Sequence, residues 1–430
     1  FYAIITSLGG FFMFDILKEQ LSDLFQHFIV FIKWILIALL VGGIVGLIAS
    51  GFYYSMAFVT KFRMSHDFMI FLLPIGGCII IAFYHLLGVK VVKGTNLVIS
   101  SIRSDEPIPF KMAPLIFGST VITHLVGGSA GREGAALQLG GSIAQQIGRI
   151  LHLDDKDLHI ITMAGMSAAF TTLFGTPITA TLFSMEVVSV GLMYYAALIP
   201  CAFSSIVAYS VAHYFHIAPE HFSIVSIPEY SALTLGKVMV LGILCAILSI
   251  IFCTLLHQAS HFFSDHFQNS YFKVVTGSVI LIILYLIFSR DYAGAGMNII
   301  EKAIEGDVKA EAFILKMIFT AITLGCGFKG GEIVPSFFVG ATFGCLMGQI
   351  LHISPSMCAA LGLVALFCGV TNCPMTSLIL SFELFGFDGV LYFLLIDAIS
   401  YMLSGYTGLY KEQKIMYSKY SPIYINQKTK

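Results

Sequence analysis

The chain has 430 residues, of which 57% are hydrophobic and only 11% are charged, and its mean hydropathy is +0.90. An ordinary soluble domain carries roughly 25% charged residues, so this composition excludes a soluble globular protein and predicts one that sits in lipid. The net charge of −1 provides no basic surface of the kind that binds nucleic acid, which is therefore not an expected partner.

The N-terminal segment, residues 1–26, carries charges of both signs and is expected to be peripheral, as a short amphipathic helix at the membrane surface. A helix needs roughly 20 apolar residues to cross a bilayer. Five stretches without Asp, Glu, Lys or Arg exceed that length: 34–60, 68–89, 158–185, 187–219 and 238–264. The uncharged run 333–382 is long enough to contain more than one crossing.

Polar sequence divides the chain into two membrane parts and a tail. Residues 218–231 form a connector with two prolines and two glutamates, so the first membrane repeat is expected over 27–217 and the second over 232–410. Residues 411–430 carry five lysines against one glutamate. By the positive-inside rule, this short tail is predicted to be cytoplasmic.

A block of sequence occurs twice, about 200 residues apart, starting at Gly131 and at Gly330. Matches at an offset of 200 and then 197 pair Gly131, Gly140, Gly148, Gly165, Phe170, Pro177 and Glu186 with Gly331, Gly340, Gly348, Gly362, Phe367, Pro374 and Glu383. A repeat of this length in an apolar chain predicts two related halves with a site between them. The repeat alone does not decide whether the halves are inverted or parallel.

The motif GREGA, Gly131–Ala135, combines glycines with a glutamate at a predicted helix start. Glycines let backbone N–H groups face a small anion there, assisted by the helix dipole. A buried Glu133 would repel that anion when ionised and admit it when protonated. Two alternatives stay open: Glu133 forms a structural ion pair with Arg132, or the glycines serve only close helix packing, which suits Gly140 and Gly148.

Two further motifs carry candidate residues. In GFKGGEIVP, residues 327–335, Glu332 is either a second proton site or the partner of Lys329. In KGTNLVIS, residues 93–100, Thr95 either donates its hydroxyl to an anion or caps a helix. The chain has no glycine loop ending in Gly-Lys-Ser or Gly-Lys-Thr and no metal-ligand spacing, so we expect no cofactor, no metal and no enzymatic activity.

These motifs resemble those of the CLC family of chloride channels and anion/proton antiporters. GREGA looks like that family's GREGP, GGEIVP at Gly330–Pro335 like its GGxFxP, and Tyr410 in SGYTGLY like its pore-lining tyrosine, while GTNLV at Gly94–Val98 stands in place of GSGIP. The resemblance covers roughly residues 30–415. It implies an all-α integral membrane fold of two inverted-topology repeats, with tilted and broken helices around a central anion pathway, and a homodimer with one pathway in each subunit.

The same resemblance assigns roles to residues. Glu133 would be the gating glutamate, and Glu332 would assist proton transfer. The anion path would be lined by Thr95, Gly131, Arg132, Gly134, Ala135, Ile333, Val334 and Tyr410.

The sequence GFKGGE resembles the fluoride-exporting subgroup of this family, which lacks the usual internal glutamate. Here FGTPITATLFSMEVV supplies Val187 at that position, with Glu186 one residue earlier. The predicted function is exchange of fluoride, or chloride, for protons across a bacterial plasma membrane, with the halide, the proton and the lipid bilayer as partners. The alternatives are a passive chloride channel of the same fold, or a membrane enzyme or scaffold that binds a phosphorylated lipid.

Overall fold

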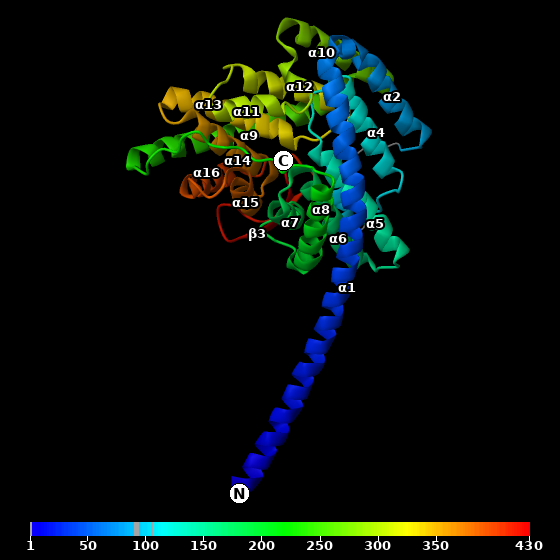
Figure 1. Ribbon diagram of the computed structural model, residues 1–430, viewed down its shortest axis with the longest axis vertical. Helices are drawn as coiled ribbons and strands as arrows, with labels where there is room; N and C mark the ends of the chain where they lie inside the picture. Colours follow the sequence, from blue (N-terminus) through cyan, green and yellow to red (C-terminus); the bar gives the residue numbers. More distant parts are fainter. Residues whose placement is uncertain (1, 90–93, 105) are drawn as a thin grey trace.

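The computed structural model describes residues 2–89, 94–104 and 106–430, with side chains from residue 18 onward. These residues form α-helices, short 3₁₀ helices (η) and one small sheet (Figure 1). The first half contains α1 (Tyr2–Ser65), η1 (Asp67–Leu72), α2 (Leu73–Leu86), α3 (Thr95–Arg103), α4 (Met112–Leu125), α5 (Glu133–Ile150), α6 (Asp155–Phe174), α7 (Pro177–Glu186), β1 (Ser189–Val190), η2 (Tyr195–Ala197) and α8 (Leu198–Tyr214).

The second half repeats this all-helical pattern and ends in two strands. It contains α9 (Ala232–His266), α10 (Ser270–Ile287), η3 (Arg290–Tyr292), α11 (Met297–Glu305), α12 (Ala312–Cys326), α13 (Ile333–Leu351), α14 (Pro355–Thr371), α15 (Pro374–Phe385), α16 (Val390–Leu403), β2 (Lys414–Tyr417) and β3 (Tyr424–Lys428).

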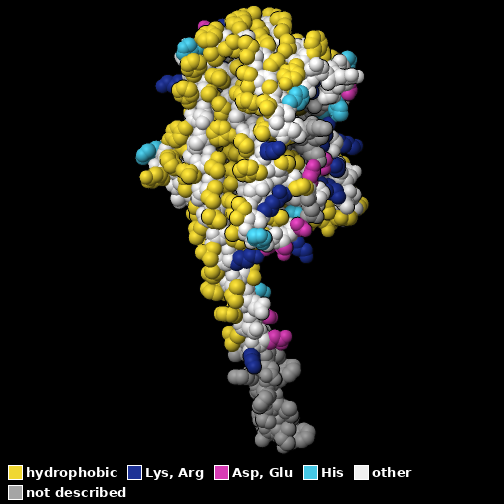
Figure 2. All heavy atoms as spheres, turned by 90° about the vertical axis from the view of Figure 1, so that its right-hand side faces the viewer, with side chains coloured by type: hydrophobic (Ala, Val, Ile, Leu, Met, Phe, Trp, Pro, Cys, Tyr) yellow, Lys and Arg dark blue, Asp and Glu magenta, His cyan; other side chains and the backbone are white. Residues whose placement is uncertain are grey.

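Six helical stretches of the described chain are long and apolar enough to cross a membrane. They are Lys18–Ser65, Asp67–Leu86, Tyr195–Tyr214, Ala232–His266, Ser270–Ile287 and Ile333–Leu351. Hydrophobic side chains cover most of the body on the face shown in Figure 2. A continuous apolar surface of this extent fits lipid contact, so the protein is a multi-pass membrane protein.

Helix α1 is continuous over 64 residues, which at 1.5 Å per residue is about 96 Å. Its C-terminal part packs on the body, where Val41, Val45 and Phe52 are buried. Its N-terminal part projects from the body (Figure 1). Residues 2–26, expected to be a separate peripheral segment, therefore belong to the same helix as the first span, and their placement at the membrane surface stays a prediction.

Both halves contain a helix break at the same place in the repeat. Helix α6 ends at Gly175 with φ 71°, and Pro177 begins α7. Helix α14 ends at Asn372 with φ 58°, and Pro374 begins α15. Left-handed residues end helices and proline suits a helix start, so each half contains a helix interrupted by sequence-encoded signals.

Glycines at matching positions bring the inner helices into backbone contact. A Cβ on Gly140 would overlap the carbonyl oxygen of Gly165, which packs α5 against α6. A Cβ on Gly340 would overlap the carbonyl oxygen of Gly362, which packs α13 against α14. The packing role considered for Gly140 is therefore confirmed.

The two halves are also joined by a reciprocal pair of helix caps. The Glu383 carboxylate accepts a hydrogen bond from the Thr179 N–H at 2.7 Å, at the start of α7. In return, the Glu186 carboxylate accepts from the Thr376 N–H at 2.8 Å and from its hydroxyl at 2.6 Å, at the start of α15. Because each half gives the other the same contact, the two halves are related by an approximate two-fold axis, which agrees with the predicted inverted-topology repeats.

The C-terminal tail folds back onto both halves. Strand β2 pairs in parallel with β1 of the first half and antiparallel with β3. Gln413 is buried, and its amide donates to the carbonyl oxygens of Val187 at 2.9 Å and Thr371 at 2.8 Å. The tail is thus an ordered part of the body in this structure.

Candidate functional site

The two copies of the repeated block meet at one backbone contact. Gly131 and Gly331 form an antiparallel bridge in which each N–H donates to the other residue's carbonyl oxygen at 2.8 Å. Helix α5 begins two residues after the first glycine, and α13 begins two residues after the second. The N-terminal ends of two helices, with their unpaired N–H groups and partial positive charge, therefore lie beside each other.

Glycine is required at this bridge for steric reasons. A Cβ on Gly331 would lie 2.6 Å from the Gly134 nitrogen, and a Cβ on Gly131 would lie 2.6 Å from Glu133 Oε2. Packing and site formation are therefore not alternatives for these glycines, because the close approach of the two backbones creates the site.

Glu133 is the first residue of α5, and its side chain is only 2% exposed. Its Oε2 accepts a hydrogen bond from the Arg132 N–H at 2.8 Å, and its Oε1 lies 3.4 Å from Arg132 Nε. The carboxylate therefore folds back over the bridge at the helix start, the position that a bound anion would need. The ion pair with Arg132, considered as an alternative to gating, is present and holds the carboxylate there.

The Arg132 guanidinium also contacts two groups outside the motif. Its Nη2 lies 3.1 Å from Glu220 Oε1 in the connector, and it stacks 4.8 Å from the centre of the Tyr53 ring of α1. Glu220 was not among the predicted site residues. It stands 88 residues away from Arg132 in a segment without regular structure, so no periodic pattern marks it.

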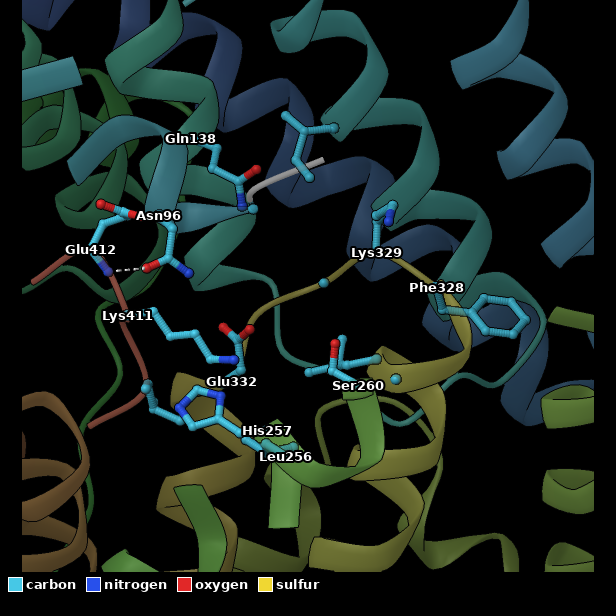
Figure 3. Close-up of a pocket in the computed structure, with 16 residues that line it drawn as sticks. Asn96, Gln138, Leu256, His257, Ser260, Phe328, Lys329, Glu332, Lys411 and Glu412 are labelled. Atoms are coloured by element: carbon cyan, nitrogen blue, oxygen red, sulfur yellow. Dashed lines mark hydrogen bonds between the residues drawn. The ribbon is translucent and has the colours of Figure 1, made fainter. Parts of the chain in front are cut away.

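Glu332, the residue before α13, is arranged differently. Its Oε2 is buried and has no hydrogen-bond partner among the described residues. The ion pair expected as one alternative, with Lys329, is not formed within the described chain: Lys329 Nζ lies 5.3 Å from the centre of the Tyr84 ring, and Figure 3 shows the lysine pointing away from Glu332. The pairing alternative is therefore wrong, and the role of Glu332 as a proton site stays a prediction.

Thr95 and Tyr410, the two hydroxyl groups predicted to line the anion path, differ in their contacts. The Thr95 hydroxyl donates to the Gly134 carbonyl oxygen at 3.4 Å and accepts from the Gln138 amide at 3.4 Å, so it is not free, and Gly94 rather than Thr95 caps α3. The Tyr410 hydroxyl is buried and has no hydrogen-bond partner in the described part of the chain. Gln138 adds a polar group that the motifs did not indicate.

The remaining predicted residues, Ala135, Ile333 and Val334, are apolar and fully buried. Their side chains offer no hydrogen-bond donor, so their contribution is limited to first-turn backbone N–H groups and to packing.

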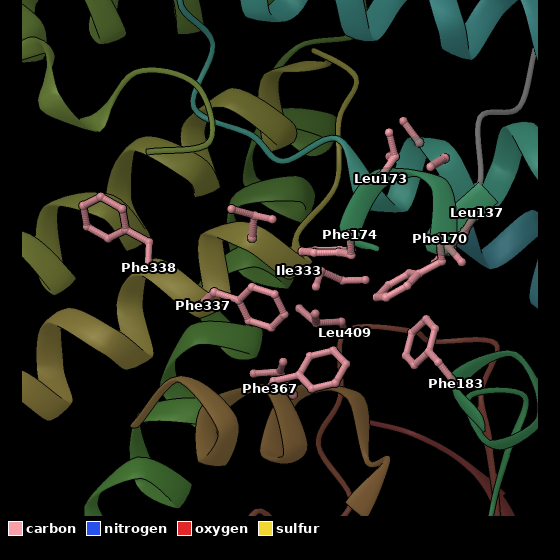
Figure 4. Close-up of a cluster of buried hydrophobic side chains, with 14 of the residues drawn as sticks. Leu137, Phe170, Leu173, Phe174, Phe183, Ile333, Phe337, Phe338, Phe367 and Leu409 are labelled. Atoms are coloured by element: carbon pink, nitrogen blue, oxygen red, sulfur yellow. The ribbon is translucent and has the colours of Figure 1, made fainter. Parts of the chain in front are cut away.

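A closed ring of phenylalanines lies beside Ile333 and joins the halves (Figure 4). Neighbouring ring centroids are 4.7–5.8 Å apart in the order Phe170, Phe174, Phe337, Phe367, Phe183. Phe170 and Phe367 are matched positions of the repeat, which is the one signal for this ring in the sequence. Spacings of this size are those of favourable aromatic pairs.

Two cavities approach the bridge and share no lining residue. The tail-side cavity, of about 370 Å³, is lined by Glu332, Gly330, Gln138, His257, Lys329 and Lys411 among others (Figure 3). The connector-side cavity, of about 630 Å³, is lined by Arg132, Glu220, Tyr53, Arg63, His124 and Glu301 among others. Basic and acidic side chains line both cavities.

Comparison with known proteins places this geometry in a family. Residues 79–405 match the family described as "Voltage gated chloride channel". The chloride/fluoride channel protein of Pseudomonas syringae pv. tomato is 34% identical over 396 residues, which cover 90% of this chain and 88% of that protein. The H(+)/Cl(-) exchange transporter ClcA of Vibrio vulnificus is 24% identical over 405 residues, which cover 85% of each chain.

Among solved structures, the crystal structure of a CLC-type fluoride/proton antiporter has the same fold. It superposes with a TM-score of 0.85 at 28% sequence identity, over 89% of this chain and 97% of that one.

Proposed function

Because the chain belongs to the voltage-gated chloride channel (CLC) family, we propose that it exchanges fluoride for protons across the membrane, with chloride as the second candidate anion. The Pseudomonas relative is named a chloride/fluoride channel protein, the Vibrio relative an H(+)/Cl(-) exchange transporter and the solved structure a fluoride/proton antiporter, which supports ion transport rather than catalysis. The proposal assigns the gate to Glu133 and an accessory proton site to Glu332.

One observation carries the gate assignment: the buried Glu133 carboxylate lies at the helix start beside the Gly131–Gly331 bridge. An ionised carboxylate there satisfies the positive end of α5 and excludes another anion from it. A protonated carboxyl loses that attraction, so it can leave the position to an incoming anion. Proton binding and anion entry are thereby coupled at one place.

Glu332 supports the second half of the proposal. Its carboxylate reaches the tail-side cavity, and its Oε2 has no partner within the described residues. A buried carboxylate without a cation is far more stable when it holds a proton. Glu332 is therefore suited to receive a proton from one side and pass it toward the bridge.

Fluoride is the favoured substrate for a chemical reason. It is the smallest halide and the strongest hydrogen-bond acceptor, so a site made of first-turn backbone N–H groups suits it. A fluoride ion can also share a hydrogen bond with the proton of a carboxyl group, which links both ions at Glu133. The names of the Pseudomonas relative and of the solved antiporter include fluoride, which agrees with this choice.

The proposal also covers the cellular location and the oligomeric state. The plasma membrane is the proposed location, with the lysine-rich tail and its cavity on the cytoplasmic side. A homodimer with one pathway in each subunit is proposed, and Ile178, Ile206, Leu391 and Leu394 are large apolar side chains that stand exposed on the isolated chain. Cross-linking in native membranes tests the dimer.

The test of function uses purified protein in liposomes, with fluoride and pH electrodes reading both ions at once. A fluoride gradient should drive protons in the opposite direction, and Glu133→Gln should abolish the proton movement while fluoride still passes. Glu305→Gln, at an exposed acid of α11, is the matched control and should behave as the unmodified protein does. Normal fluoride-driven proton movement in Glu133→Gln would refute the gate.

A passive channel predicts another outcome in the same experiment. Chloride or fluoride would then flow to its own Nernst equilibrium, with no proton movement at any pH.

A further inference from the structure

The connector between the halves, residues 218–231, has a fixed position close to Arg132 and the proposed gate. The Glu220 N–H donates to the Phe174 carbonyl oxygen at 2.9 Å, at the end of α6 in the first half. The Phe222 N–H donates to the Leu384 carbonyl oxygen at 2.9 Å, in α15 of the second half. Pro219 packs so closely on Gly175 that a Cβ there would lie 2.5 Å from the proline Cα. The Glu220 side chain is therefore presented from a defined backbone position.

Glu220 and Glu133 both contact the guanidinium of Arg132. Arg132 Nη2 lies 3.1 Å from Glu220 Oε1, and Arg132 Nε lies 3.4 Å from Glu133 Oε1. The exposed fraction of the side chain falls from 22% at Glu220 through 14% at Arg132 to 2% at Glu133. Arg132 thus links the more exposed carboxylate of Glu220, in the connector, to the buried carboxylate of Glu133.

We propose that Glu220 is a positioning residue that holds Arg132 and thereby sets the pH at which the Glu133 gate opens. This inference rests on the proposed role of Glu133 as the gate. Glu220 neither touches the anion nor carries the proton; it acts through the arginine.

The direction of the effect follows from the charges. When Glu220 is ionised, Arg132 interacts with both carboxylates, so it attracts Glu133 less strongly. The negative charge of Glu220 also disfavours a second ionised carboxylate nearby. Without that charge, Arg132 would hold the ionised Glu133 more strongly. Protons would then displace the closed gate only at lower pH.

Other charged groups face the same cavity from each surrounding element. They are Lys61 and Arg63 of α1, His124 of α4 and Glu301 of α11. Burial raises the pKa of Glu220, the Arg132 guanidinium opposes that rise, and Glu301 adds to it. Only Arg132 forms an ion pair with Glu220 among the described residues, so the arginine is the route by which Glu220 acts on the gate.

The test measures fluoride/proton exchange in liposomes as a function of pH on the connector side. Glu220→Gln should move the midpoint of the pH–rate profile to lower pH by roughly 0.5–1 unit. Glu220→Asp keeps the charge and should restore most of the midpoint. Glu301→Gln removes a charge from the same cavity, but Glu301 forms no ion pair with Arg132 within the described residues, so this variant should move the midpoint much less. Gel filtration of each purified variant checks that it is folded.

The outcomes separate this inference from the proposed function. An unchanged midpoint in folded Glu220→Gln, or an equal shift in Glu301→Gln, overturns the role of Glu220. In the Glu133→Gln background, Glu220→Gln should cause no further pH shift, since the titrating gate is gone; a persisting shift also overturns it. If Glu133→Gln itself keeps proton coupling, the gate assignment fails, whatever Glu220 does.

Discussion

The two copies of the repeated block have the same backbone but opposite electrostatic surroundings. Both place a glycine in the bridge and start a helix two residues later. In the first copy, the carboxylate of Glu133 is paired with Arg132. In the second copy, the carboxylate of Glu332 is buried with no partner among the described residues at its Oε2.

This difference shows how one duplicated scaffold can provide two functions. A paired carboxylate at a helix start is stable when ionised and can compete with an anion. An unpaired buried carboxylate is stable when protonated. The backbone of both copies makes the site, and in the proposed mechanism the different side chains divide anion exclusion, at Glu133, from proton storage, at Glu332.

The largest effect is expected from a substitution in the Gly131–Gly331 bridge, which both copies of the block share. Gly331→Val places side-chain atoms against the Gly134 backbone and should destabilise the protein by about 1–3 kcal/mol while abolishing fluoride transport. The measurements are the melting temperature in detergent and fluoride efflux from liposomes. Gly43→Ala, in α1 where a Cβ meets nothing within 4 Å, is the control and should leave both unchanged. Transport at the normal rate in Gly331→Val would show that the close approach is dispensable.

The second prediction separates the two carboxylates by kinetics. Glu332→Gln should slow fluoride and proton movement together, by about 100-fold, because proton transfer limits a gate that can still close. The ratio of the two ion fluxes should stay as in the unmodified protein. Rapid fluoride flow without protons, the behaviour expected of Glu133→Gln, would contradict a separate role for Glu332.

The smallest effect concerns the reciprocal caps, where the two copies are alike. Glu383→Ala and Glu186→Ala each remove the hydrogen bonds at one helix start and should lower the free energy of unfolding by about 1–2 kcal/mol. Equal losses of thermal stability with unchanged ion coupling are expected. A change of proton coupling in the Glu186 variant alone would indicate that this residue does more than cap α15.

Much of the architecture could be predicted because the repeat is encoded in residues that fix the backbone. Gly140 and Gly340 permit close helix packing, and Pro177 and Pro374 restart the interrupted helices. Charge-free length identified five of the six spans in the described chain, but it missed Ser270–Ile287, which contains Lys273. The predicted stretch 158–185 is not one span, because it is divided between α6 and α7. Each of these signals lies in neighbouring residues of the sequence, so it can be recognised without knowing the fold.

The parts of the site that escaped prediction depend on contacts between distant segments. Lys329 and Glu332 are close in sequence, but the irregular segment that carries them turns the lysine toward Tyr84. Glu220 meets Arg132 only because the connector folds back across the body. The phenylalanine ring could not be predicted either. Helices buried on all sides have no apolar periodicity that would identify the face on which such a ring forms.

The reciprocal hydrogen bonds between the halves also limit how the protein can move. Pulling the halves apart would break both bonds of the Gly131–Gly331 bridge and remove the hydrogen bonds of the carboxylates of Glu186 and Glu383, of which Glu186 is buried. Rocking of one repeat against the other therefore has a high free-energy cost. A transport cycle that rotates a few side chains around an immobile backbone has a lower free-energy cost. It also leaves the lipid-facing surface of the protein unchanged.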